Sequence, residues 1–162
     1  MENVYWMNES YRDNAMFNEV AGNDKKLSMT ALLNQEKLIA EEAKELKDAL
    51  TENNPVKVLD GVVDLYVVLD GFATKLEALG FDISTALKQT IENNMSKFPS
   101  SKEVAEQTVD HYAKQGVTTT MEYNEKYGRW VIKDTNGKIR KPVGFVSNDL
   151  SNCLPEGFSE FK

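Results

Sequence analysis

Hydrophobic positions recur with helical spacing over the first two-thirds of the chain. Between Met29 and Leu50 they recur at steps of three, four and seven residues, which predicts an amphipathic helix. A second helix is predicted from Pro55 to Leu79, with Asn54 as its N-terminal cap. This second helix has an apolar stripe and further apolar residues on the opposite face, so we expect it to be buried nearly all round. The polar turn between the two helices is short, which favours an antiparallel pair.

Three shorter helices flank this pair, with predicted bounds at residues 9–21, 83–98 and 101–115. Residues 1–8 precede them as a loose aromatic arm. Ser100 and Glu103 have the spacing of a capping box at the start of the last helix. Asn94 falls in the middle of the apolar stripe of the helix before it, so we expect its amide to be buried.

The spacing changes from helical to strand-like after residue 116. Residues 117–124 and 129–133 are rich in Thr, Val, Tyr, Trp and Ile, and turn residues separate and follow them. This pattern predicts a small β-hairpin or a three-strand meander, which must pack on the helices or on a partner subunit because an isolated hairpin is marginally stable. The sequence therefore predicts an all-α fold, a four- to five-helix bundle over residues 1–116, with a small C-terminal β-hairpin and tail as an appendage over residues 117–162.

The composition of the chain limits which kinds of binding partner we expect. The 162 residues suffice for one domain with its own core, and the net charge is −7. An acidic chain is a poor candidate for binding a nucleic-acid polymer. Cys153 is the single cysteine, so no intrachain disulfide can form. The longest apolar-rich stretch is too short to span a bilayer and the N-terminus has no signal-peptide pattern, so we expect a cytoplasmic protein without a membrane partner.

Acidic residues on the predicted helix pair are the candidates for a functional site. Glu42 and Glu45 are three residues apart beside the apolar stripe of the first helix, which makes them surface neighbours. Asp60 and Asp64 are four apart on a face of the second helix that is otherwise apolar. Buried carboxylates that repel one another are costly unless a positive charge lies between them. A cluster of carboxylates without His or Cys suits Mg²⁺, which prefers oxygen ligands.

A purely structural explanation stays open for part of this pattern. Lys37 and Lys44 lie four and three residues from Glu41, as on a solvated helix face, and Glu42 and Glu45 are neighbours on the same helix. For the first helix alone this solvated face is the better explanation, and the aspartates of the second helix are what favour a metal site. The single histidine, His111, is expected to be a surface or packing residue, and a di-iron carboxylate bundle, which needs Glu-x-x-His pairs, is disfavoured.

Three short segments resemble the MazG-like, all-α nucleoside triphosphate pyrophosphohydrolases: residues 41–46 (EEAKEL), 59–65 (LDGVVDL) and 93–98 (NNMSKF). This superfamily includes dimeric dUTPases, dCTPases and phosphoribosyl-ATP pyrophosphohydrolase. The resemblance is good over residues 15–98 and looser over the rest of the chain.

The family pattern is an E-x-x-E on one helix and an E-x-x-D on the next. Glu42 and Glu45 match the first motif, and Asp64 matches the last acid of the second. Gly61 stands where the pattern has its other glutamate, and Asp60 is the available substitute. The resemblance implies that Glu42, Glu45 and Asp64 hold the main Mg²⁺, with Asp60 completing that site or holding a second ion.

The resemblance also implies the reaction. Such an enzyme uses Mg²⁺, with Mn²⁺ as a substitute ion, to split a nucleoside triphosphate into a nucleoside monophosphate and pyrophosphate, with dUTP or dCTP as the favoured substrates. Glu41 is a candidate catalytic base or second-ion ligand beside Glu42 and Glu45. The candidate substrate contacts are Asn94, Lys97, Lys141 and Phe17. Members of the family form homodimers or homotetramers, and the two-sided apolar helix agrees with such an assembly.

Two other functions stay open. Hydrolysis of phosphoribosyl-ATP is less favoured, because the chain lacks an obvious basic set for the extra phosphoribosyl group. A non-enzymatic helical interaction module, in which the acids only solubilise the protein, predicts that Mg²⁺ leaves the melting temperature unchanged, since only a ligand of the folded state raises it.

Overall fold

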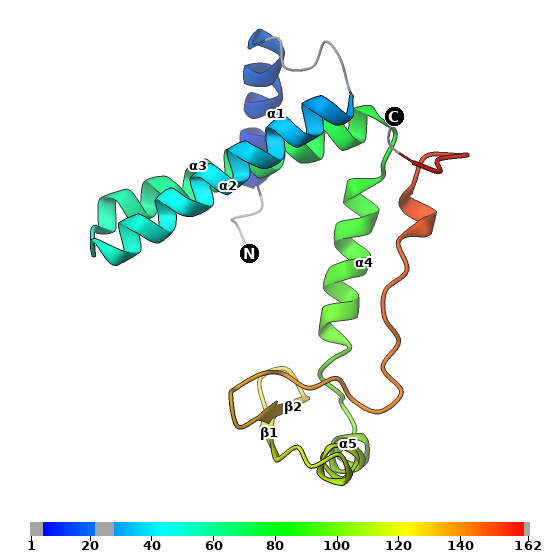
Figure 1. Cartoon of the computed structure of the whole chain (residues 1–162). Coiled ribbons are helices and arrows are strands. Elements are labelled where there is room, and N and C mark those ends of the chain that lie inside the picture. The colour runs from blue at the N-terminus through cyan, green and yellow to red at the C-terminus, as the bar shows by residue number, and fades with distance from the viewer. Residues whose placement is uncertain (1–4, 22–27, 161–162) are drawn as a thin grey trace. The chain divides into compact units, whose positions relative to one another are not determined.

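The computed structural model describes residues 5–21 and 28–160 of the chain. Within these residues it has five α-helices and one two-stranded antiparallel sheet (Figure 1). The bounds are α1 Tyr5–Val20, α2 Met29–Thr51, α3 Pro55–Ala78, α4 Ile83–Met95, α5 Lys102–Lys114, β1 Thr119–Asn124 and β2 Arg129–Asp134. The predicted helical fold with a small β-hairpin appendage is confirmed.

The chain divides into two compact units. The helical unit is Met1–Ile83 together with Cys153–Lys162, and the hairpin unit is Ser84–Asn152. The helices α1, α2 and α3 belong to the helical unit, whereas α5, the sheet and nearly all of α4 belong to the hairpin unit. The boundary at residue 116, between a helical catalytic domain and the hairpin appendage, stays a prediction.

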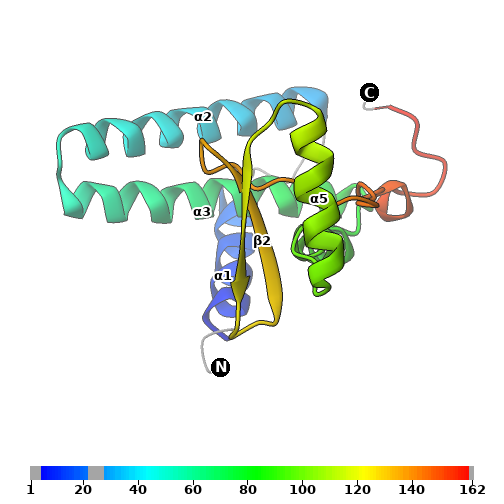
Figure 2. The ribbon, with the colours of Figure 1, turned by 90° about the horizontal axis from the view of Figure 1, so that it is seen from below.

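A short polar turn makes α2 and α3 antiparallel neighbours, as Figure 2 shows. Asn53 adopts a left-handed backbone with φ of 53°, and the amide of Asn54 donates to the carbonyl of Ala49 at 3.1 Å, which closes the end of α2. The side chain of Asn54 accepts from the amide of Lys57 at 3.2 Å and caps α3. Two adjacent asparagines therefore end one helix and start the next, and the predicted antiparallel pair is confirmed.

Polar side chains fasten the three helices of the helical unit together. Gly71 of α3 lies so close to α2 that a Cβ there would be 3.2 Å from Nε2 of Gln35. The Gln35 side chain donates to the carbonyl of Val68 at 2.8 Å and accepts from Nζ of Lys75 at 2.9 Å. From α1, the side chain of Asn14 donates to a carbonyl and a carboxylate of α3 at 2.8 and 2.9 Å. Buried polar groups need such partners, so these bonds fix the register of the helices.

One face of α3 is exposed, so the prediction that this helix is buried nearly all round is wrong for the single chain. We call this face the apolar strip, and it consists of Val56, Leu59, Val63 and Val67. The exposed fractions of these residues fall from 76% at Val56 to 39% at Val67. Helices α1 and α2 contact α3, but they leave this strip open. Among the described residues, no helix combines the length and the apolar content that a membrane span requires.

The hairpin unit buries a small core between α5 and the sheet. Strands β1 and β2 pair in antiparallel register along their whole length. Ile132 of β2 and Ala105 and Thr108 of α5 are 0% exposed. A single bridge between Lys133 and Ile139 extends the sheet. The predicted β segment is therefore a hairpin with one added bridge, and not a full three-strand meander.

Two helix starts differ from their predicted positions. Helix α1 begins at Tyr5, so the end of the predicted loose arm is helical, and residues 1–4 lie outside the described part of the chain. Ser101 caps α5 by accepting from a backbone amide at 3.3 Å. The predicted capping box of Ser100 and Glu103 is therefore wrong, because adjacent serines are equally good caps and the spacing alone favoured the earlier one.

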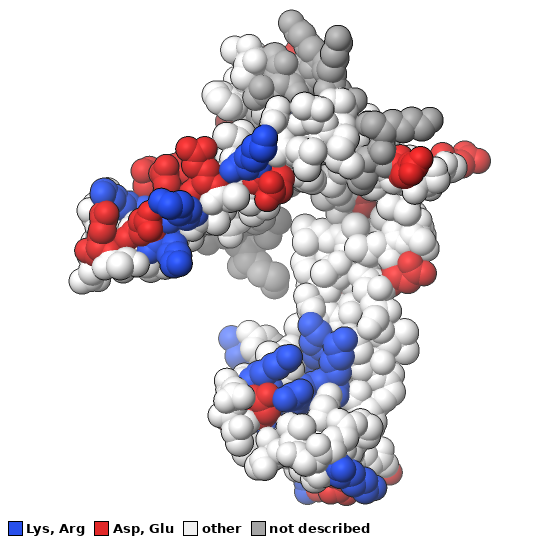
Figure 3. Space-filling view, in the orientation of Figure 1, with Lys and Arg blue, Asp and Glu red and all other residues white. Residues whose placement is uncertain are grey.

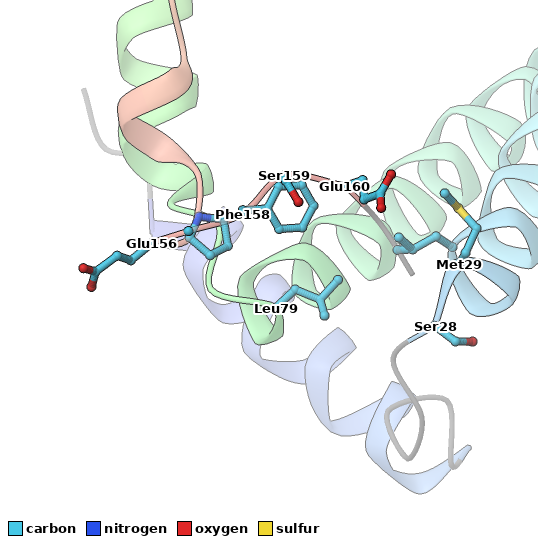
Figure 4. A pocket seen from close by; sticks show the side chains of 10 residues that line it. Ser28, Met29, Leu79, Glu156, Phe158, Ser159 and Glu160 are labelled. Atoms are coloured by element: carbon cyan, nitrogen blue, oxygen red, sulfur yellow. The ribbon is translucent and has the colours of Figure 1, made fainter.

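The C-terminal segment from Cys153 onward packs on the helical unit. The carbonyl of Cys153 accepts from the amide of Asp82 at 2.9 Å, and the ring of Phe158 meets that of Phe81 edge to face at 4.9 Å. The tail, the end of α3 and the start of α2 line a pocket of about 380 Å³, beside which Phe158 and Leu79 lie (Figure 4). The tail therefore covers the C-terminal end of α3.

Candidate functional site

The pairing of α2 and α3 brings the predicted acidic residues together. Glu41, Glu42 and Glu45 lie on α2, and Asp60 and Asp64 lie on α3. Partial burial raises the pKa of Glu42, and the negative charges of the other four raise it further, that of Asp64 most. Asp and Glu side chains gather over this helix pair in Figure 3. We call these five residues the carboxylate cluster.

Neighbouring lysines form their ion pairs outside the carboxylate cluster. Nζ of Lys44 lies 2.8 Å from the carboxylate of Asp48, and Nζ of Lys57 lies 2.8 Å from that of Glu52. Glu45 interacts with the charge of Lys44, but no ion pair among the residues that the structure describes includes a member of the cluster. A group of carboxylates without ion pairs is an arrangement that attracts a cation.

The side chains of the cluster are accessible. Glu41, Glu45 and Asp60 are exposed, and Glu42 and Asp64 are half-buried. In the described ranges, no three His, Cys, Asp or Glu side chains lie close enough together to hold a metal ion as they stand. Mg²⁺ keeps several of its waters and needs only one or two protein carboxylates. These residues could hold such an ion once their side chains turn toward it.

A small pocket adjoins the cluster where α2 ends and α3 begins. Its volume is about 280 Å³, and Glu45 and Asp60 of the cluster are among its lining residues. Asp48 and Glu52 line it as well, and sequence analysis missed both. They follow Glu45 by three and seven residues, which places all three on one helix face. This spacing was the signal that could have found them.

Gly61 has a packing role at the position where the family pattern has glutamate. A Cβ at Gly61 would lie 3.1 Å from Cα and 3.3 Å from the backbone nitrogen of Leu46 on α2. Backbone atoms of a packed helix cannot move aside as a flexible side chain can. Gly61 therefore lets α2 and α3 approach closely, and Asp60 presents the neighbouring carboxylate to the pocket.

The predicted substrate contacts lie in both units. Phe17 is on α1 of the helical unit and is 60% exposed. Asn94, Lys97 and Lys141 belong to the hairpin unit. Asn94 is exposed and not buried as expected, because no helix covers this face of α4 among the described residues. Its Oδ1 accepts from Nζ of Lys97 at 2.6 Å, within its own segment. The roles of these four residues stay predictions.

No protein-family profile, curated protein or solved structure matches this chain.

Proposed function

We propose that the protein is a Mg²⁺-dependent nucleoside triphosphate pyrophosphohydrolase that releases a nucleoside monophosphate and pyrophosphate. The observation that carries this proposal is the carboxylate cluster, in which four acids from two antiparallel helices act on Glu42 and none of the five forms an ion pair among the described residues. Such a cluster repels a triphosphate by itself, so a cation has to mediate between the two. The resemblance of residues 41–46 and 59–65 to the MazG-like enzymes supports the same reaction.

The residues divide into an ion-holding set and a candidate base. Glu42, Glu45 and Asp64 hold the main ion, and Asp60 completes this site or holds a second one. A bound Mg²⁺ or Mn²⁺ supplies charge neutralisation on the phosphate oxygens. Glu41 is exposed next to Glu42, where it accepts the proton of the attacking water.

The favoured substrate is a deoxynucleoside triphosphate, dUTP or dCTP, on the resemblance alone. Phe17 is exposed on the same unit as the cluster, and an exposed aromatic ring is available to stack on a base. Asn94, Lys97 and Lys141 belong to the hairpin unit, and their roles as substrate contacts rest on the sequence alone. Phosphoribosyl-ATP is the alternative substrate.

The working form is a homodimer or homotetramer. Val56, Leu59, Val63 and Val67 of the apolar strip lie on the same helix as Asp60, and a row of exposed aliphatic side chains of this length marks an interaction surface. Covering the strip with a second copy would remove water from the side of α3 next to the carboxylates. The lower dielectric would then strengthen the interaction of the carboxylates with a cation.

Product analysis tests the reaction. The full chain is incubated with a panel of deoxynucleoside and ribonucleoside triphosphates, with Mg²⁺ and with EDTA. We expect monophosphate and pyrophosphate in a one-to-one ratio, only with the metal. Glu45→Gln should abolish product formation, whereas Glu36→Gln, which removes an exposed charge from the same helix outside the cluster, should not. Orthophosphate as the product, or equal turnover by both variants, would contradict the proposal.

Thermal denaturation separates the enzyme from the interaction module. An ion that binds only the folded protein raises its melting temperature, by an amount that depends on the ion concentration relative to the dissociation constant. We expect Mg²⁺ to raise the melting temperature of the native chain and to leave that of Glu45→Gln nearly unchanged. An unchanged melting temperature of the native chain in millimolar Mg²⁺ would support the interaction module.

A further inference from the structure

The hairpin unit contains a concave site whose charged lining residues are all basic. The pocket has a volume of about 400 Å³ and lies between the last turn of α5 and residues 141–147. His111 and Tyr112 line it from α5, and Lys141, Phe145 and Ser147 line it from the other side. None of its lining residues is acidic, although the chain has a net charge of −7.

Hydrogen bonds to α5 hold the far wall of this basic pocket in place. The hydroxyl of Thr108, which is 0% exposed, accepts from the amide of Val143 at 3.0 Å. One helical turn later, the hydroxyl of Tyr112 donates to the carbonyl of Lys141 at 3.1 Å. The amide of Phe145 donates to the carbonyl of Pro142 at 3.0 Å and closes a turn. The backbone of the pocket is therefore fixed before any ligand arrives.

Lys141 of the pocket has no ion-pair partner among the described residues, in contrast to Arg140, the residue before it in the chain. Arg140 is already committed, because its guanidinium lies 2.6 Å from the carboxylate of Asp134. Nζ of Lys141 instead lies over the ring of Phe145, 4.7 Å from its centroid, and no ion pair of the described residues includes it. A cation held against an aromatic ring and open to solvent is available to an anion.

His111 supplies a second polar group to the pocket, from the last turn of α5. Its Nε2 is 2.9 Å from Nε2 of Gln115, so in this arrangement the amide donates and the imidazole nitrogen accepts. The other ring nitrogen, Nδ1, then carries the proton and is a hydrogen-bond donor.

We propose that this basic pocket binds the phosphate group of a small anion, with Lys141 as the cationic contact and with His111 and Ser147 as hydrogen-bonding contacts. The rings of Tyr112 and Phe145 give the pocket an apolar side that suits a nucleobase. Inorganic pyrophosphate and a nucleoside monophosphate share the phosphate chemistry and are the two candidate ligands. The proposal depends on the hairpin unit alone and holds whether or not the carboxylate cluster hydrolyses triphosphates.

A titration without metal tests this proposal separately from catalysis. The full chain in EDTA is titrated with inorganic pyrophosphate, with uridine monophosphate and with uridine, while NMR follows the His111 ring and the amides of residues 143–147. EDTA keeps the carboxylate cluster free of cations, so the cluster repels the added anions. We expect saturable shifts with the two phosphate compounds and none with uridine. Tighter binding of uridine monophosphate would identify a nucleotide as the ligand, and tighter binding of pyrophosphate would identify the free anion.

Matched variants assign the binding to this pocket. Lys141→Ala and His111→Gln should each weaken binding by about fivefold, the effect of removing one exposed polar or charged contact. The fold should survive, because Tyr112 bonds to the backbone carbonyl of residue 141 and not to its side chain. Lys114→Ala removes a charge from the same last turn of α5 outside the pocket and should leave binding unchanged. Absence of saturable shifts in millimolar ligand, or equal weakening by Lys114→Ala, would overturn the proposal.

Discussion

The two units of this protein differ in how completely they bury side chains. In the hairpin unit, Ile132 and Thr108 are fully buried and form the centre of a small core. In the helical unit, the buried polar side chains of Asn18, Gln35 and Lys75 stay 6% to 9% exposed, and large apolar side chains of α3 are exposed as well. The helical unit thus presents acids and aliphatic groups along α3, for which an ion and a second copy are the expected partners.

The two units also differ in the sign of their excess charge. Asp and Glu outnumber Lys and Arg in the helical unit but not in the hairpin unit. The helical unit has a carboxylate cluster without an ion pair among the described residues, and the hairpin unit has a pocket whose charged lining is basic. Figure 3 shows acidic side chains over α2 and α3 and basic ones over the hairpin unit. The units therefore suit ligands of opposite charge.

The largest expected effect is on turnover. Asp64→Asn should lower the hydrolysis rate by about a thousandfold, as loss of a charge that holds the catalytic ion does. The variant should melt in EDTA at least as high as the native chain, because Asp64 is in no ion pair or hydrogen bond that the structure describes and its charge repels that of Glu42. Steady-state kinetics and thermal denaturation measure the two quantities. Loss of the fold together with the activity would mean that Asp64 has a structural role instead.

The next effect is on stability and should be confined to the hairpin unit. Ile132→Ala should cost about 2–5 kcal/mol, because it leaves a cavity in a fully buried core. Hydrogen exchange of the amides of β1 and β2 should accelerate, while exchange in α2 and α3 should not change. Leu59→Ala is the matched change in the helical unit, where the side chain is 67% exposed, and it should cost little in dilute protein. Equal costs for the two variants would erase the contrast between the units.

A third test concerns the apolar strip. The double variant Leu59→Ser and Val63→Ser should shift the protein from a dimer or tetramer to a monomer, because it removes aliphatic contact area from the proposed interface. Light scattering coupled to size-exclusion chromatography measures the mass. Val146→Ser, in the hairpin unit, changes a side chain that is 76% exposed and should leave the mass unchanged. A monomeric native protein would contradict the proposed assembly.

Local patterns explain which parts of the fold could be predicted. The helix pair and the hairpin follow from periodicity and from the turn residues Asn53 and Asn54, which act on neighbouring residues only. The exposure of α3 could not be predicted, because an apolar stripe shows that a face prefers to be covered but not which element covers it. The exposure of Asn94 was missed for the same reason.

In the candidate site, too, local patterns predict contacts near in the sequence but not those between distant segments. The acids of the cluster could be predicted to meet, since an antiparallel pair with a short turn brings residues near its closed end together. Lys44 pairs with Asp48, four residues after it, and not with Glu41, three residues before it, and both separations place side chains on the same helix face, so spacing alone does not decide between them. The basic pocket depends on Val143 and Lys141 bonding to α5 across more than twenty residues of sequence. No local pattern in the sequence indicates such contacts.

The smallest expected effect is an opposite response of the two units to acid. In the hairpin unit, the carboxylate of Asp134 accepts from the amides of Lys138 and Asn136 at 2.9 Å each, and the Lys138 bond contributes most to lowering its pKa. A lowered pKa means that the stability from Asp134 is complete above the ordinary aspartate pKa and is lost as the pH falls through the lowered value. In the helical unit, burial and like charges raise the pKa of Glu42, so the folded state favours its protonated form. That contribution is present below the ordinary glutamate pKa and is lost as the pH rises through the raised value.

Acidification without metal should therefore destabilise the hairpin unit and relieve the helical unit. Hydrogen exchange between pH 7 and pH 3, corrected for the intrinsic pH dependence of exchange, measures the protection of each unit separately. Asp134→Asn should lower the protection of β2 at neutral pH and flatten its pH dependence. Glu42→Gln should instead raise the protection of α2 at neutral pH, because it removes a charge that its neighbours repel. A fall in α2 protection with Glu42→Gln would mean that the carboxylate of Glu42 stabilises the folded state, and the repulsion within the cluster, on which the expected affinity for a cation depends, would be absent.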